Sequence, residues 1–177
     1  TNDNIKKADG AFVKSSEERL ERWREFFKGL YNHDPPTGPL PEPPAIDPPT
    51  KIMADTEPTE VEVKTAIRAL KNGKAPGIDR VTAEAIKASG EILSHRLHLL
   101  ITMIWRSEHI PLKWKKAIII PIHKKDDSQE CQNYRGISLL SIVGKVFMKI
   151  VQSRLQKHRE QTSREEQAGF RPGRGCT

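Results

Sequence analysis

The sequence predicts an α+β fold in which helices come first and a β-hairpin with one more helix comes last. Apolar residues recur every three or four positions in residues 15–30 and 91–107, which is the period of an amphipathic helix. A short β-branched run at 117–122 predicts a strand, and residues 134–139, after a polar, turn-like stretch, are predicted to form a second one. The helical period then returns from Val143 to Leu155.

Residues 15–30 are predicted to form the first helix. Ser15 and Glu18 have the spacing of a capping box, in which two side chains satisfy backbone amides at a helix start. Large apolar residues follow at helical spacing. An apolar stripe of this size needs a partner surface, so we expect it to pack on a neighbouring element. The stripe consists of Leu20, Trp23, Phe26, Phe27 and Leu30.

A proline-rich stretch marks the clearest boundary in the chain. Eight of the 13 prolines fall between residues 35 and 49. Such a stretch cannot form a helix or a central strand and favours an extended, semi-rigid conformation. A spacer and an adaptor ligand are the two roles open to it. We divide the chain into a helical region at 1–34, a proline-rich linker at 35–55, a helical region at 56–109 and a mixed region at 110–177.

Three helices are predicted between the linker and the first strand. Thr56 or Glu57 caps the first of them, and Pro58 suits its first turn. The second is short and begins at Thr82, whose hydroxyl favours a helix start. The third is the amphipathic helix at about 91–107, and its apolar side consists of Leu93, Leu97, Leu100, Ile101 and Ile104.

The charge of the chain is large and unevenly placed. A formal net charge of +7 favours a polyanionic partner, most simply nucleic acid. Residues 110–177 contain 14 Lys and Arg against 6 Asp and Glu, whereas residues 1–109 contain 16 against 17. A solvated surface also accounts for a modest basic excess, but the asymmetry favours a phosphate-facing surface in the C-terminal third.

The cysteines and the hydropathy of the chain indicate its cellular compartment. Cys131 and Cys176 lie far apart, which favours a reducing intracellular compartment, the cytoplasm or the nucleus, over a disulfide scaffold. No apolar run approaches the roughly 20 residues that span a bilayer, so no membrane partner is expected.

Three motifs occur in order along the second half of the chain: KNGKAPGID at 71–79, NYRGISLL at 133–140 and QAGFRPGRGCT at 167–177. Together they resemble the reverse transcriptase of non-LTR (LINE-type) retrotransposons over about residues 56–177. The resemblance implies a helical N-terminal extension followed by a partial fingers subdomain with a β-hairpin. It also implies that the catalytic carboxylates lie beyond Thr177. We therefore expect no catalytic residue here, and a missing palm and thumb in the same polyprotein.

The resemblance assigns substrate contacts to individual residues. Lys124 and Arg135 flank the tip of the predicted hairpin, where the family holds the phosphates of the incoming nucleotide. An Arg fork can donate two bonds to a phosphate, and a nearby Lys adds a point charge. Contacts to the template and primer fall on Lys74, Gly77, Asp79, Gly169, Phe170, Arg171 and Arg174.

Two residues of the 71–80 loop each have two possible roles. Asp79 either orients the loop by accepting bonds from backbone amides or contacts the ligand, and the structural role is favoured. Arg80 stands where the family pattern has Gly. This arginine either adds a phosphate contact or occupies a turn that needs a positive φ.

Other patterns are assigned to structure and not to chemistry. Asp126-Asp127 lacks the aromatic context of the family's metal-binding pair, so we assign it to the hairpin turn. His95 and His98 fall at i, i+3 on one helix and could share a metal, but no Cys or carboxylate is placed to complete four zinc ligands. We therefore expect no metal ligands in this chain.

These observations predict part of an RNA-directed DNA polymerase that copies RNA. Its partners would be an RNA template, a DNA primer and deoxynucleoside triphosphates, with Mg²⁺ as the cofactor of the complete enzyme and none bound by this chain. The alternative is a retroelement-derived, non-catalytic nucleic-acid-binding module. A weaker alternative is an interaction protein that uses the proline-rich stretch and the aromatic helix.

Overall fold

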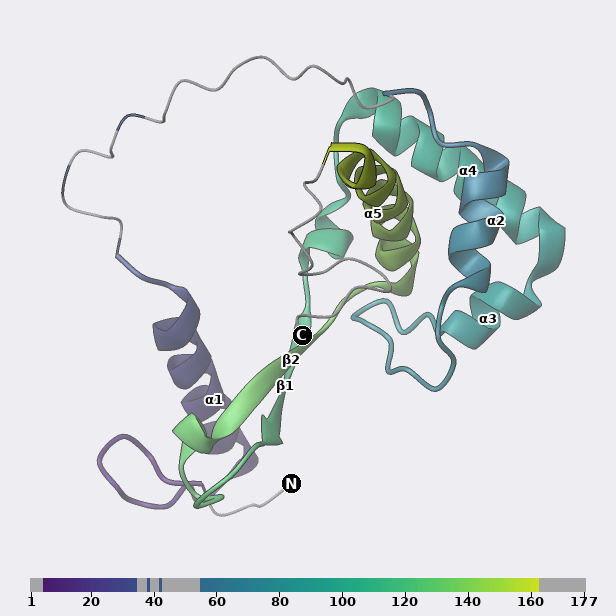
Figure 1. Cartoon of the computed structure of the whole chain (residues 1–177). Coiled ribbons are helices and arrows are strands. Elements are labelled where there is room, and N and C mark those ends of the chain that lie inside the picture. Colours follow the sequence, from purple (N-terminus) through teal and green to yellow (C-terminus); the bar gives the residue numbers. More distant parts are fainter. Residues whose placement is uncertain (1–4, 35–37, 39–41, 43–54, 163–177) are drawn as a thin grey trace, which may run out of the picture. The chain divides into compact units, whose positions relative to one another are not determined.

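The computed structural model describes residues 5–34, 38, 42 and 55–162. It contains both helices and a two-stranded sheet, which confirms the predicted α+β class (Figure 1). In chain order the elements are α1 (Ser16–Tyr31), α2 (Glu60–Arg68), α3 (Ala83–Ala88), α4 (Gly90–Ser107), the 3-10 turn η1 (Leu112–Lys115), β1 (Ile118–His123), the 3-10 turn η2 (Cys131–Asn133), β2 (Tyr134–Leu139) and α5 (Ile142–Thr162).

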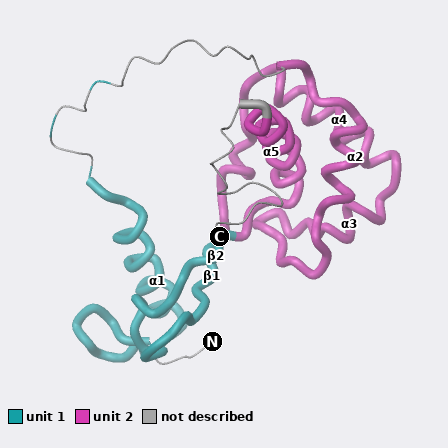
Figure 2. Tube along the Cα trace, viewed as in Figure 1, with its two compact units in different colours: residues 1–46, 118–138 teal, residues 47–117, 139–177 magenta. Residues whose placement is uncertain are grey.

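The chain divides into two compact units (Figure 2). The first comprises Thr1–Ile46 and Ile118–Ser138, and the second comprises Asp47–Ala117 and Leu139–Thr177. This grouping differs from the four consecutive regions predicted from the sequence, because the hairpin groups with α1, which lies far from it in the chain. The proline-rich stretch lies almost wholly outside the described residues.

Unit 1 is built from α1 and the hairpin. Ser15 caps α1 as predicted by accepting a bond from the amide of Glu18 at 3.2 Å. The Glu18 carboxylate accepts from the amide of Lys14 at 2.8 Å, so the reciprocal bond reaches one residue further than a capping box requires. The aromatic stripe packs on the hairpin, with Trp23 and Tyr134 rings 4.9 Å apart. Gly136 leaves room for the Phe27 ring, which a Cβ would approach to 2.8 Å.

Unit 2 is a helical assembly around one apolar core. The helix α2 packs against α3, α4 and α5 (Figure 1). Val63, Ile101 and Val146, one from each of α2, α4 and α5, are fully buried at the centre. Of the predicted apolar side of α4, Leu97, Ile101 and Ile104 are buried, whereas Leu93 is partly buried and Leu100 is exposed.

The start of α2 differs from the sequence prediction. Neither Thr56 nor Glu57 caps the helix, and Pro58 does not lie in its first turn. Thr59 is the N-cap, because its side chain accepts from the amide of Glu62 at 3.2 Å while the Glu62 carboxylate accepts from the amide of Thr59 at 2.8 Å. This reciprocal capping box satisfies two amides at once and sets the helix start.

A largely buried arginine ties α5 to the segment that begins α2. Arg154 donates two bonds to the Glu62 carboxylate, at 2.7 and 2.8 Å, and its guanidinium lies 5.1 Å from the centre of the Trp105 ring. The hydrogen bonds from Arg154 lower the pKa of Glu62 to about 2. Among the described residues no helix is long and apolar enough to cross a bilayer.

Candidate nucleic-acid interface

Side chains of α3 hold the first part of the loop that follows α2. The Lys87 ammonium donates to the Leu70 carbonyl at 2.5 Å and to the Asn72 side chain at 2.7 Å. The Glu84 carboxylate accepts from the amide of Gly73 at 2.5 Å, where the backbone adopts a φ of +66°. These bonds fix the course of the chain before Lys74, one of the residues predicted to contact the template.

Gly77 brings the loop into direct contact with the segment before α5. Gly77 is buried, and a Cβ at this position would lie 2.6 Å from the Leu140 carbonyl carbon and 2.6 Å from the Ser141 nitrogen. Because both neighbours are backbone atoms, only glycine permits this approach. Gly77 thus has a packing role, and its predicted contact with the template stays a prediction.

Asp79 completes the attachment of the loop. Its carboxylate accepts from the buried Ser141 hydroxyl at 2.5 Å and from the amide of Val81 at 3.3 Å. The Ser141 oxygen in turn accepts from the amide of Gly144 at 3.2 Å, in the first turn of α5. These bonds are the loop-orienting role predicted for Asp79, and through Ser141 the carboxylate reaches the start of α5.

Arg80 occupies a left-handed backbone conformation, with a φ of +57°. This is the conformation that glycine adopts without steric cost, and an L-residue pays roughly 1–2 kcal/mol for it. The position therefore does need a positive φ, and Arg80 adopts it. The side chain is exposed, so a phosphate contact is compatible with the geometry.

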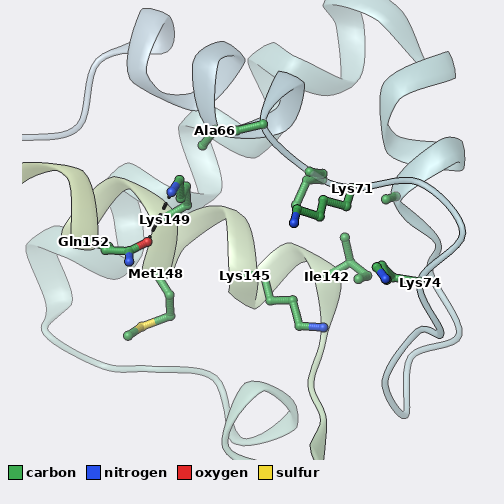
Figure 3. Close-up of a pocket in the computed structure, with 11 residues that line it drawn as sticks. Ala66, Lys71, Lys74, Ile142, Lys145, Met148, Lys149 and Gln152 are labelled. Atoms are coloured by element: carbon green, nitrogen blue, oxygen red, sulfur yellow. Dashed lines mark hydrogen bonds between the residues drawn. The ribbon is translucent and has the colours of Figure 1, made fainter. Parts of the chain in front are cut away.

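Four lysines surround a hollow between this loop and α5 (Figure 3). We call this feature the lysine groove, and its volume is about 510 Å³. Lys71 and Lys74 come from the loop, and Lys145 and Lys149 come from α5 (Figure 3). The rest of the lining is mostly apolar and consists of Ala66, Ala69, Leu70, Ala83, Ile142, Met148 and Gln152.

The lysines of the groove have no described carboxylate as a partner. None of the four forms an ion pair within residues 5–34 or 55–162, and Lys149 donates to the Gln152 side chain at 3.2 Å. Ammonium groups without a paired carboxylate can bind regularly spaced negative charges, and an apolar floor can receive flat apolar faces. A nucleic-acid strand has both features, in its phosphates and its bases.

Of the four groove lysines, only Lys74 is predicted from the sequence to contact the template or primer. Lys71 is part of the KNGKAPGID run, and Lys145 and Lys149 are four residues apart on a predicted helix, which places them on one face. This i, i+4 spacing is the feature of the sequence that indicates a basic face on the helix. The packing of α5 next to the loop, which completes the groove, is not encoded in any local pattern.

The hairpin in unit 1 places Lys124 and Arg135 on one face. The amide of Lys124 donates to the Asn133 carbonyl at 2.9 Å, and the rings of His123 and Tyr134 are 5.1 Å apart. In this register Arg135 lies opposite Ile122, two residues before Lys124, so both basic residues share the face that points away from Tyr134. Both are exposed, and neither pairs with a described carboxylate.

The aspartate pair at the hairpin tip is engaged in turn structure, as predicted. Asp126 has a φ of +58° and lies 3.5 Å from the Lys125 ammonium. Asp127 accepts from the amide of Gln129 at 2.9 Å and lies 3.5 Å from Lys6, and the Gln129 amide lowers the pKa of this carboxyl. Both residues thus have partners within the turn, and the expectation that they bind no catalytic metal stays a prediction. The remaining predicted contacts, Gly169, Phe170, Arg171 and Arg174, lie outside the described residues.

Comparison with known proteins places the chain among retrotransposon proteins. It is 27% identical over 171 residues to an uncharacterized 149 kDa protein of transposon TX1 from Xenopus laevis, covering 94% of this chain and 13% of that protein. It is 32% identical over 133 residues to a protein named as the probable RNA-directed DNA polymerase of transposon BS from Drosophila melanogaster, covering 73% and 15%. No family model matches the chain.

By these matches the chain is similar to a section of the proteins of non-LTR retrotransposons. Within that class it is similar to RNA-directed DNA polymerases, among them the polymerase of mobile element jockey from Drosophila melanogaster, at 33% identity over 95 residues. The match covers 53% of this chain and 10% of the jockey protein. The resemblance drawn from the motifs is confirmed, and the chain spans 10–15% of the length of these relatives.

Proposed function

We propose that this chain forms the template- and nucleotide-contacting section of an RNA-directed DNA polymerase of a non-LTR retrotransposon. The observation that carries the proposal is the lysine groove, four lysines without a described carboxylate around an apolar floor, next to a loop that Gly77 and Asp79 hold in place. The similarity to named polymerases supports the reaction class.

The groove and its loop are assigned to the nucleic acid. Lys74 and the lysines of α5 would neutralise successive phosphates of the RNA template or the DNA primer, and the apolar floor would receive the bases or sugars. The Asp79–Ser141 bond serves the site indirectly, because it keeps the loop and the first turn of α5 at a constant separation. Gly169, Phe170, Arg171 and Arg174 remain assigned to the same ligand by the motif alone.

The hairpin is assigned to the incoming nucleotide. Lys124 and Arg135 share one exposed face, so a triphosphate could accept the two parallel bonds of the Arg fork and a bond from the ammonium. Neither residue would break or form a covalent bond. Their part is to bind and orient the deoxynucleoside triphosphate.

Catalysis is assigned to residues outside these 177. The complete polymerase would use Mg²⁺, and we assign Asp126-Asp127 to the hairpin turn, where a backbone amide and a lysine are their partners. We propose that this chain alone binds nucleic acid without extending a primer, and that it works with a palm and thumb of the same polyprotein inside the cell. Metal-dependent primer extension by the pure chain would contradict this part of the proposal.

Salt dependence of RNA binding tests the groove. The variant Lys71→Gln/Lys145→Gln/Lys149→Gln is compared with Lys14→Gln/Lys28→Gln/Lys157→Gln, which changes the net charge by the same amount at positions outside the groove. Each phosphate contact that a variant removes lowers the slope of log K against log salt by about 0.7 for a single strand, so we expect a drop of about 2 for the groove variant. Equal effects of the two variants would contradict the groove as the binding site.

Arg135→Ala separates the polymerase proposal from a non-catalytic binding module. If the hairpin holds nucleotide phosphates, the variant loses deoxynucleoside triphosphate binding and keeps the RNA-binding affinity. If Arg135 serves only non-specific attraction, the variant reduces the salt slope of RNA binding by about 0.7 and leaves nucleotide binding unchanged.

A further inference from the structure

Three potential metal ligands meet where α2 begins beside α4. Glu60 is the first residue of α2, and His95 and His98 lie one turn apart on α4. One ligand atom from each residue lies within 4.8 Å of the other two, and the His95 Nδ1 and a Glu60 carboxylate oxygen are 3.5 Å apart. Glu60 is separated from His95 by 35 residues and approaches it through tertiary packing, so no local sequence pattern predicts this cluster.

The hydrogen bonding of His98 leaves one ring nitrogen available for a metal. Its Nε2 lies 2.9 Å from the Pro58 carbonyl, which can only accept, so Nε2 carries the proton in the neutral ring. Nδ1 is then unprotonated, and its lone pair can bind a metal. This nitrogen is buried and has no hydrogen-bond partner among the described residues. A histidine whose second nitrogen donates to a backbone carbonyl is the usual arrangement of a metal-bound imidazole.

Glu60 also has one side-chain atom engaged and a second available for a metal. One carboxylate oxygen accepts from the Lys64 ammonium at 3.0 Å, and the other faces His95. The oxygen that faces His95 is therefore not the one that Lys64 contacts.

We propose that Glu60, His95 and His98 bind a Zn²⁺ ion that links α2 to α4. Tetrahedral zinc with bonds of about 2.0–2.1 Å places its ligand atoms about 3.3 Å apart, close to the observed Glu60–His95 separation. The exposed fractions of the side chains are 57% for His95 and 36% for Glu60, which leaves both free to rotate onto the ion. A hollow of about 520 Å³ over Glu60, Glu91 and His95 has room for a water molecule as the fourth ligand.

A simple hydrogen bond between His95 and Glu60 is the competing interpretation. It accounts for the 3.5 Å separation but gives no role to the unpartnered His98 Nδ1. In the proposed zinc site, His98 Nδ1 would be the third ligand atom beside Glu60 and His95. The site does not involve the lysine groove, so the two proposals stand or fall separately.

Titration of the full 177-residue chain with Co²⁺, which replaces Zn²⁺ and absorbs visible light in tetrahedral sites, tests the proposal. We expect one equivalent of Co²⁺ to bind with a tetrahedral absorption band, to be displaced by Zn²⁺, and to raise the thermal midpoint. Glu60→Gln and His95→Ala should each weaken binding by at least about tenfold, since each removes a ligand. Both positions are at least one-third exposed, so these variants are expected to fold.

The matched control is His109→Ala, a histidine of the same unit that lies outside the cluster. It should bind Co²⁺ like the parent chain. The proposal is overturned if the parent chain binds no Co²⁺, if Glu60→Gln and His95→Ala bind as tightly as the parent, or if His109→Ala weakens binding as much as they do.

Discussion

In unit 2, twelve buried apolar residues form one continuous cluster between α2, α3, α4 and α5. In unit 1, the described buried apolar side chains are Ile5, Phe27 and Cys131. Unit 1 instead depends on ring contacts, such as the Trp23–Phe27 stack at 5.8 Å and the Trp23–Tyr134 contact at 4.9 Å. The difference indicates that unit 2 supplies most of the packing free energy, because stabilisation follows the apolar area removed from water.

The hairpin of unit 1 shows the same contrast at the level of single residues. Ile118, Ile120 and Ile122 alternate along β1, yet each is about 40% exposed. Ile101 in unit 2 is fully buried. The proposed nucleotide contacts thus lie on a hairpin with little burial, whereas the lysine groove lies on the packed helices. Substitutions in the two units should therefore differ in their effect on stability.

Ile101→Ala should have the largest effect, a loss of stability in unit 2. The residue is fully buried at the centre of the core, so truncating its side chain leaves a cavity. We expect the free energy of unfolding to fall by about 3 kcal/mol. Urea unfolding is followed by the fluorescence of Trp105 and Trp114 in a Trp23→Phe background, which reports on unit 2 alone. The control is Ile92→Ala on the same helix, where 80% exposure predicts a change within about 0.5 kcal/mol. Similar losses for the two variants would contradict the assigned core.

Two Gly→Ala variants compare how each unit tolerates one added methyl group. At Gly77 the methyl would meet backbone atoms of Leu140 and Ser141 at 2.6 Å, and backbone cannot rotate away. We expect a loss of about 2–3 kcal/mol in unit 2. At Gly136 the neighbours at 2.8 and 2.9 Å are side-chain atoms of Phe27 and Ile119, which can shift, so we expect about 1 kcal/mol in unit 1. The reverse order in urea unfolding would show that the loop, and not the hairpin, is the adaptable part.

The same contrast explains what the sequence can and cannot predict. The starts of α1 and α3 follow from Ser15 and Thr82, because a cap is a local interaction. The predicted start of α2 is wrong although its signal is local, because Thr59 and Glu62 have the spacing of a capping box and Thr56 has no Glu or Gln three residues later. The groove and the Glu60 cluster do not follow from any local pattern, because they join residues from packed helices that lie far apart in the chain.

Acidification should weaken unit 2 through Glu62. Its pKa is about 2 in the folded chain against an ordinary 4.5, so the stabilisation by Arg154 is present above about pH 4.5 and is lost as the pH falls towards 2. Because the carboxylate is about one-third exposed, we expect Glu62→Gln to lower the free energy of unfolding by about 1 kcal/mol at pH 7. The deficit should vanish near pH 2, and a deficit that persists there would contradict the linkage.

The control for this acid effect comes from unit 1. Glu21 pairs with Arg24 in a pair whose side chains are 62% and 67% exposed. Solvent screens such a pair, so Glu21→Gln should leave the free energy of unfolding nearly unchanged at every pH. An acid-dependent loss as large as that of Glu62→Gln would show that burial does not distinguish the two pairs.

Arg80→Gly has the smallest expected effect and the opposite sign. Glycine relieves the left-handed conformation at φ +57° but adds freedom to the unfolded chain, so we expect a net gain of about 0.5 kcal/mol in unit 2. If Arg80 also contacts a phosphate, the same variant lowers the salt slope of RNA binding by about 0.7. Arg80→Lys keeps both the charge and the strained backbone, and should therefore change neither property. A less stable Arg80→Gly variant would mean that the arginine side chain contributes packing that outweighs the strain of its backbone.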